Sequence, residues 1–162
     1  MTTRKTDLKV HPIDAAELDE VRQQGIDLWG NAPEAFVSDG GDQLRCCLRL
    51  SEPGERLWVI AHAPLTAQRP WREVGPVFVH ATACAGYEAA QGLPGFISAK
   101  ARVLRSYTAD GAMYYAGNRV TGPGDDLNAV LQERSRTPRS PRCICETSRP
   151  SASSRGSPAE PM

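Results

Sequence analysis

The stretch Gly75-Pro76-Val77-Phe78-Val79-His80 is the densest apolar run of the chain that holds both β-branched and aromatic residues. Such residues favour a strand that packs at least one face against a core. We therefore expect residues 76–80 to form the central strand of the core, with the remaining elements packed around it. A functional site that uses His80 would then lie at the margin of the sheet.

The segment Leu57-Trp58-Val59-Ile60-Ala61-His62 is apolar on both faces, which predicts a second interior strand. The connection over 63–74 holds two prolines and no helical period. Because a parallel crossover generally needs a helix, we expect the two strands to run antiparallel. His62 and His80 would then lie at opposite ends of the sheet and share no site.

Three helices are indicated by their capping residues. Asp14, with Glu17 three residues later, predicts a capping box, and Gly25 predicts the end of a helix over 15–24. Thr82 predicts the cap of a short helix over 83–90. Asp125 predicts the cap of a last helix. The apolar stripe of that last helix is expected to consist of Leu127, Val130 and Leu131.

Further strands are expected on both sides of the central pair. Residues 44–50 predict a strand that is followed by a turn at 52–55. Residues 26–42 end in Ser-Asp-Gly-Gly-Asp, a composition that is typical of a loop. Residues 8–10 are a candidate for a short strand.

Residues 98–108 alternate as a strand does, with Ala101 and Val103 on one face and Arg102 on the other; a helix over 96–104 is the alternative. Asp110-Gly111 predicts a type I′ hairpin that places Tyr107 opposite Tyr114 and starts a second arm over 112–120.

These elements together predict an α+β fold, in which an antiparallel sheet of about five strands has helices beside it. Residues 1–134 are expected to form one domain. Residues 135–162 contain seven serines, five prolines and five arginines, but only one large aliphatic residue, Ile144. Such a segment buries too little apolar surface to offset its ordering entropy, so we expect a disordered tail.

The charges are balanced, with 19 basic and 19 acidic residues, so no global field attracts nucleic acid or an acidic membrane. The tail is basic but has no aromatic residue to stack on bases, and nucleic-acid binding is not expected. No targeting signal and no apolar run of membrane-spanning length is present. Five unevenly spaced cysteines do not resemble a disulfide framework, so we expect a cytoplasmic protein.

Cys47, His80 and Cys84 form the most suggestive set of polar residues, because thiolate and imidazole are ligands that zinc prefers. A closed structural site needs four ligands, and only three are available here unless Cys46, or a cysteine that the chain has lost with a C-terminal strand, completes the shell. The alternative is structural: a free cysteine packs as a small apolar residue, and a histidine at a strand end bonds to backbone.

Thiol chemistry is a second interpretation of the same residues. On a helix capped by Thr82, Cys84 would lie in the first turn, where the helix dipole favours the thiolate, and His80 would act as its base. Arg45 and Arg49 would lie on one face of their strand, either holding an anion or facing solvent. Cys143 and Cys145 lie in the tail, and we interpret them as incidental.

The segments Arg45-Cys46-Cys47-Leu48-Arg49 and Glu52-Pro53-Gly54-Glu55, and the run from Gly75 to Ala81 followed by Cys84 and Tyr87, resemble a bacterial family. This family is catalogued as domain of unknown function 1203, and the resemblance covers roughly residues 33–134. It implies no activity, because the family is uncharacterised.

The chain departs from the family pattern in two places. Leu44 stands where the family segment Pro-Cys-Arg-x-Cys-Leu has its first cysteine, while Cys47 matches the second. The family also ends in a strand with a Gly-Cys-aromatic motif, where this chain has its Arg/Ser/Pro tail. We hypothesise that the reading frame changes near Ser135, and we expect the loss of that strand to lower stability.

The sequence therefore predicts a small cytoplasmic binding or interaction domain whose partner is unknown. The alternative is a metal-binding protein, or a thiol-dependent enzyme, that uses Cys47, His80 and Cys84.

Overall fold

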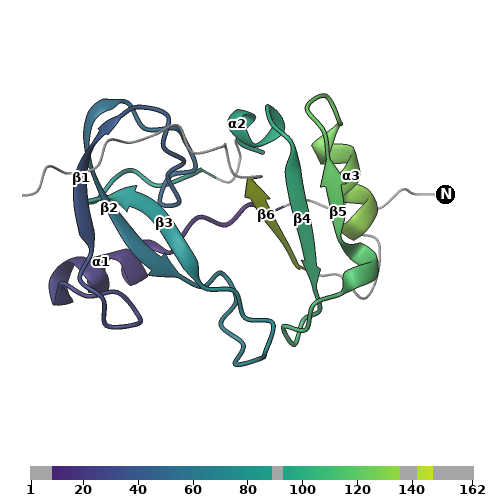
Figure 1. The fold of residues 1–162 in the computed structure, drawn as a ribbon, viewed down its shortest axis with the longest axis horizontal. Helices are drawn as coiled ribbons and strands as arrows, with labels where there is room; N and C mark the ends of the chain where they lie inside the picture. Colours follow the sequence, from purple (N-terminus) through teal and green to yellow (C-terminus); the bar gives the residue numbers. More distant parts are fainter. Residues whose placement is uncertain (1–8, 89–92, 136–141, 148–162) are drawn as a thin grey trace, which may run out of the picture.

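The computed structural model describes residues 9–88, 93–135 and 142–147 (Figure 1). In chain order its elements are α1 (Ala15–Gln24), β1 (Glu34–Asp39), β2 (Pro53–His62), β3 (Gly75–His80), α2 (Gly95–Ser98), β4 (Arg102–Tyr107), the 3₁₀ turn η2 (Tyr115–Gly117), β5 (Arg119–Thr121), α3 (Leu127–Ser135) and β6 (Arg142–Thr147).

The strands form two antiparallel sheets, with the orders β1-β2-β3 and β5-β4-β6. Figure 1 shows the two sheets side by side, with α1 beside the first and α2 and α3 beside the second. The α+β class with antiparallel pairing is confirmed. The strands are divided between two three-stranded sheets, however, rather than joined in one sheet of about five.

The central strand of the first sheet is β2, not the stretch at 75–80. β1 pairs with one edge of β2 and lies within residues 26–42, for which the sequence predicted no strand. β3 pairs with the other edge, and the predicted antiparallel direction is confirmed: Leu57 stands opposite His80, and His62 opposite Gly75. The two histidines therefore lie at opposite ends of the sheet, and His62 instead contacts Glu17 of α1 at 3.0 Å.

The predicted helix over 15–24 is confirmed as α1. The Asp14 side chain accepts a hydrogen bond from the Ala16 backbone, and Gly25 ends the helix at φ 72°. Glu17 faces His62 and forms no capping box with Asp14. The helix contributes to the first core, whose buried members are Ile13, Leu18, Val21, Leu44, Cys46, Leu57, Ile60 and Val79.

Residues 44–50 form a tight turn, so the strand predicted there is wrong. The Leu48 N–H donates to the Leu44 carbonyl at 3.1 Å, and the Leu44 N–H donates to the Arg49 carbonyl at 2.9 Å. Leu48 adopts a positive φ of 53°, which is unfavourable for a residue with a Cβ atom. Burial of its side chain and the closing hydrogen bonds hold it in this conformation.

Three further local predictions have different outcomes. The turn at 52–55 is confirmed at the start of β2, where the Glu55 N–H donates to the Glu52 carbonyl at 3.3 Å and Gly54 has φ 89°. Residues 83–88 are not helical, so the helix predicted over 83–90 is wrong for them; 89 and 90 lie outside the described residues. Lys9 and Val10 form no strand, and residue 8 is not described.

The segment 95–107 contains both of the elements that the sequence left open, the short helix α2 and then β4. The buried face of β4 is the one that carries Arg102, Leu104 and Ser106. Arg102 is only 1% exposed, and its guanidinium donates to the carbonyls of Phe96 at 2.6 Å and Ile97 at 2.8 Å. A charged side chain is tolerated inside because it terminates α2 through these bonds.

The hairpin after β4 is not the predicted type I′ turn, because only Gly111 of the Asp110-Gly111 pair has a positive φ, 83°. Thr108 bonds to both Gly111 and Ala112, so the loop is longer than two residues. Tyr107 consequently lies opposite Met113 rather than Tyr114. The second arm over 112–120 is replaced by η2 and the short strand β5.

The last helix, α3, is confirmed, but its first turn is capped by Asp126, which accepts from the Ala129 N–H at 3.0 Å. The Asp125 carboxylate instead accepts from the Gly122 N–H at 2.9 Å. The predicted apolar stripe forms the second core with Leu104, through buried Leu127 and Val130 and partly buried Leu131.

Strand β6 lies inside the predicted disordered tail, so the prediction of disorder is wrong for residues 142–147. It pairs with β4 over six residue pairs, from Arg102↔Thr147 to Tyr107↔Arg142. A terminal strand is therefore present where the sequence predicted its loss. Residues 136–141 and 148–162 are outside the described part of the chain, and the reading-frame change stays a hypothesis. None of the described helices has the length and apolarity to cross a membrane.

The loop between β2 and β3 links the two sheets. Its Glu73 carboxylate accepts a hydrogen bond from the Tyr107 hydroxyl and pairs with Arg105 at 2.7 Å. Its Arg69 pairs with Asp110 at 2.5 Å. These polar contacts join two separate apolar cores, and no buried cluster of the described residues spans both sheets.

Candidate metal centre

Three parts of the chain meet at the end of β3. They are the turn 44–49, the residues that follow His80, and the helix α1. The turn 44–49 docks on the strand through the Arg45 N–H, which donates to the Phe78 carbonyl at 2.8 Å. After His80 the chain turns away, and the Ala81 N–H donates to the Arg56 carbonyl at 3.1 Å. The Arg22 guanidinium of α1 donates to the carbonyls of His80 and Thr82, both at 3.2 Å.

This convergence gathers three sulfurs and one imidazole nitrogen. The ligand atoms of Cys46, Cys47, His80 and Cys84 all lie within 4.8 Å of one another. The Nδ1 atom of His80 is 3.3 Å from the Cys46 sulfur and 3.9 Å from the Cys47 sulfur, and the two sulfurs are 3.9 Å apart. The cluster could bind a metal such as zinc.

The distances agree with a tetrahedral metal shell. With Zn–S near 2.3 Å and Zn–N near 2.0–2.1 Å, tetrahedral geometry puts two sulfurs about 3.8 Å apart and sulfur and nitrogen about 3.5 Å apart. The contacts among Cys46, Cys47 and His80 differ from these values by only a few tenths of an ångström. The sulfurs are also much too far apart for a disulfide bond, and all three thiols are free.

The three thiols have different environments. Cys46 is 4% exposed, and its sulfur accepts the His80 N–H at 3.4 Å. The hydrogen bond that the Cys46 thiol donates to the Cys47 sulfur, together with burial, raises the pKa of Cys46, while the same bond lowers the pKa of Cys47. Cys84 is exposed as a residue, but loss of hydration at its sulfur raises the pKa of its thiol.

The other nitrogen of His80 faces an ion pair. Its Nε2 atom lies 3.1 Å from the Arg49 guanidinium and 3.3 Å from Glu55 Oε1. The Arg49 guanidinium donates hydrogen bonds to both carboxylate oxygens of Glu55, at 3.0 and 2.5 Å. This pairing lowers the pKa of Glu55 to about 2. When Nδ1 serves as a ligand, Nε2 carries the proton and donates a hydrogen bond to the Glu55 carboxylate, as metal-bound histidines commonly do. The Arg49 guanidinium is itself a donor, so it then pairs with Glu55 and not with Nε2.

The structure thus brings together all three predicted metal ligands and adds Cys46, which the sequence left as one option for the fourth. The helix that would have activated Cys84 as a nucleophile is not there, and catalysis by Cys84 and His80 stays a prediction. Arg45 and Arg49 lie on a turn rather than a strand, and Arg49 pairs with Glu55. Cys143 and Cys145 are in β6, where side chains are not described.

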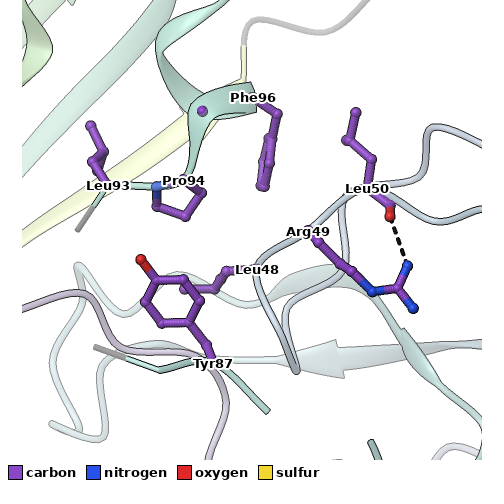
Figure 2. A pocket seen from close by; sticks show the side chains of 8 residues that line it. Leu48, Arg49, Leu50, Tyr87, Leu93, Pro94 and Phe96 are labelled. Carbon is purple, nitrogen blue, oxygen red and sulfur yellow. Dashed lines mark hydrogen bonds between the residues drawn. The ribbon is translucent and has the colours of Figure 1, made fainter. Parts of the chain in front are cut away.

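An open cavity of about 410 Å³ adjoins the cluster, between the two sheets. Its lining includes Leu48, which is the residue after Cys47, and Tyr87, which is three residues after Cys84. Phe96 of α2 also lines it. Figure 2 shows Tyr87 and Phe96 on opposite walls, while the Arg49 guanidinium turns toward the Leu50 carbonyl, 2.9 Å away. The segments that carry two of the cysteines therefore also form one wall of this cavity.

The model of the family described as "Protein of unknown function (DUF1203)" matches residues 41–141, which is more than half of the chain. The chain belongs to the DUF1203 family. The resemblance stated from the sequence is thereby confirmed, and the DUF1203 segment contains all four residues of the cluster but neither β1 nor β6. No curated protein and no solved structure matches this DUF1203 chain. Family membership by itself supplies no function.

Proposed function

We propose that this DUF1203 protein is a zinc protein in which Cys46, Cys47, His80 and Cys84 hold one structural Zn²⁺ ion. The observation that carries the proposal is the convergence of four donor atoms within 4.8 Å at the end of β3. Three thiolates and one imidazole form a donor set that zinc accepts in structural sites. Softness of the sulfur donors disfavours Mg²⁺ and Ca²⁺, which prefer oxygen.

The number of donors argues for a structural site. Catalytic zinc sites generally keep a coordination position for water or substrate, whereas four protein ligands close the tetrahedron. An ion held here would tie the turn 44–49 and the segment 81–88 to β3. Neither segment has regular secondary structure that would hold it alone. The energy of metal binding would therefore contribute directly to folding of the first half of the chain.

A thiol-dependent enzyme and an interaction domain remain predictions. The enzyme would need a low-pKa nucleophile, and the pKa of the Cys84 thiol is raised instead. The interpretation as an interaction domain identifies no partner.

The full-length chain, produced without an affinity tag and purified under reducing conditions, is expected to contain about one zinc ion per molecule by plasma mass spectrometry. Removal of the ion with a chelator should lower the melting temperature, and added ZnCl₂ should restore it, because an unfolded chain does not offer the assembled shell. Protein that is purified without metal and shows no thermal shift with ZnCl₂ would contradict the proposal.

Glu55 is expected to position His80 for metal binding. In Glu55→Gln the carboxylate that accepts the Nε2 proton becomes neutral, and zinc affinity should fall about 10- to 100-fold, the usual effect of losing such a partner. Competition with a chromogenic chelator measures the affinity. The matched control is Glu52→Gln, which alters an exposed carboxylate three residues away. Equal affinities in both variants would show that Glu55 plays no such part.

A further inference from the structure

The three sulfurs of the cluster are not equivalent with respect to solvent. Cys84 is exposed, Cys47 is half-buried and Cys46 is buried. Metal-bound cysteines are thiolates, and the thiolate is the form of cysteine that oxidants attack. A dissolved oxidant therefore reaches the cluster first at Cys84, which lies on the segment 81–88 outside any helix or strand.

The geometry also restricts which disulfide can follow. Cys46 and Cys47 are neighbours joined by a trans peptide bond, so their Cα atoms are about 3.8 Å apart. Disulfides usually need Cα atoms about 4.4–6.8 Å apart, so a bond between these neighbours is disfavoured. Any unstrained disulfide within the cluster must therefore include Cys84.

Cys46 is the less suitable partner for Cys84. Its sulfur is buried, accepts the backbone N–H of His80 at 3.4 Å and contacts the His80 ring at 3.3 Å. Withdrawing that sulfur would leave a buried backbone N–H without its acceptor. Cys47 has looser contacts, 3.9 Å to both Cys46 and His80, and it is closer to solvent.

We propose that Cys84 is an oxidation site through which hydroperoxides convert the cluster to a Cys47–Cys84 disulfide and release the metal. This proposal rests on the proposed zinc site. Only Cys46 and His80 would remain as ligands, and two donors do not retain zinc against solvent. Release would also free the segments 44–49 and 81–88, and with them one wall of the adjoining cavity.

The chemistry balances in two steps. The Cys84 thiolate attacks one oxygen of hydrogen peroxide, the O–O bond breaks, and hydroxide leaves and takes a proton to give water and a sulfenic acid. The Cys47 thiolate then attacks the Cys84 sulfur, the S–S bond forms, the S–O bond breaks, and the second hydroxide leaves as water after taking a proton. The two sulfurs lose two electrons in total, and hydrogen peroxide gains them.

The test begins with the full-length zinc-loaded chain, whose metal content is measured before treatment. Hydrogen peroxide is added, zinc release is followed with a chromogenic chelator, and the alkylated, unreduced protein is digested with trypsin. We expect release of about one zinc per chain together with a cross-link between the peptides 46–49 and 73–100. Fragment ions should assign the link to Cys47, and dithiothreitol with ZnCl₂ should reverse both changes.

The outcomes separate this proposal from the zinc site itself. Protein that carries zinc but keeps it and shows unmodified thiols overturns the oxidation site alone. A link to Cys46, or sulfinic acid without a link, also overturns it. Protein that lacks zinc before treatment overturns the zinc site, and the release step with it. A Cys143→Ser/Cys145→Ser double variant is expected to behave like the unaltered chain, which excludes the cysteines of β6 from the reaction.

Discussion

Replacement of Cys46 by serine is expected to lower the affinity for zinc about 100-fold. Cys46 is the most buried ligand, and its sulfur contacts the Nδ1 atom and the backbone N–H of His80. If one ligand of four carries about a quarter of the roughly 12 kcal/mol typical of structural zinc, the loss is about 3 kcal/mol, or about 100-fold in affinity. Metal analysis after gel filtration and competition with a chelator provide the measurement.

Stability should follow the metal in this variant. Cys46→Ser also places a hydroxyl among apolar neighbours, so its melting temperature should be lower even without metal. A given concentration of zinc should raise that temperature by less than in the unaltered chain. Cys145→Ser makes the same substitution outside the cluster and should leave zinc content unchanged. A Cys46→Ser protein that binds zinc with the affinity of the unaltered chain would show that the cluster is not the metal site.

Truncation after residue 141 is expected to produce the other large effect. Strand β6 forms a ladder of six residue pairs with β4, whose opposite edge has only the three pairs to β5. At about 1 kcal/mol for each backbone hydrogen bond, the loss is on the order of 5 kcal/mol, a large part of the stability of an ordinary domain. Urea denaturation measures it, and light scattering should report aggregation through the uncovered edge.

The matched control is a chain that stops after Thr147, which keeps β6 and removes only residues 148–162. Its denaturation midpoint should equal that of the full chain. If both truncated chains are as stable as the full chain, β6 contributes nothing to the fold, and the sequence-based expectation of a disordered tail would be restored for residues 142–147.

Local signals in the sequence predicted the elements whose ends are capped or whose apolar runs are long. Asp14 and Gly25 bound α1, and the segments 57–62 and 75–80 pair antiparallel as the short loop between them required. Elements that depend on distant partners were missed. β1 and β6 are short, polar at their ends and held by pairing with β2 and β4, which residue patterns do not reveal.

The residue types of β4 also did not predict which of its two faces is buried. Arg102 is charged and was placed on the face opposite Ala101 and Val103, and its guanidinium donates to backbone carbonyls of α2 inside the fold. A buried arginine depends on acceptors that only the tertiary structure supplies.

The candidate site was predictable in its residue types but not in its full composition. On a strand, neighbouring side chains point to opposite faces, so a strand over 44–50 would let only one of Cys46 and Cys47 reach His80. In the turn that forms instead, both sulfurs face the ring. The signal for this turn was weak, because Leu48 occupies a backbone conformation for which glycine would be the usual indicator.

The separation of the two apolar cores has a consequence for how the protein unfolds. Leu57 and Val79 belong to one interior, and Leu104 and Leu127 to the other. All four candidate ligands belong to the first half, so an ion bound there protects one cooperative unit and leaves the other to its own packing. Hydrogen exchange should therefore resolve two groups of amides, of which only the group around β2 and β3 becomes slower when metal is bound.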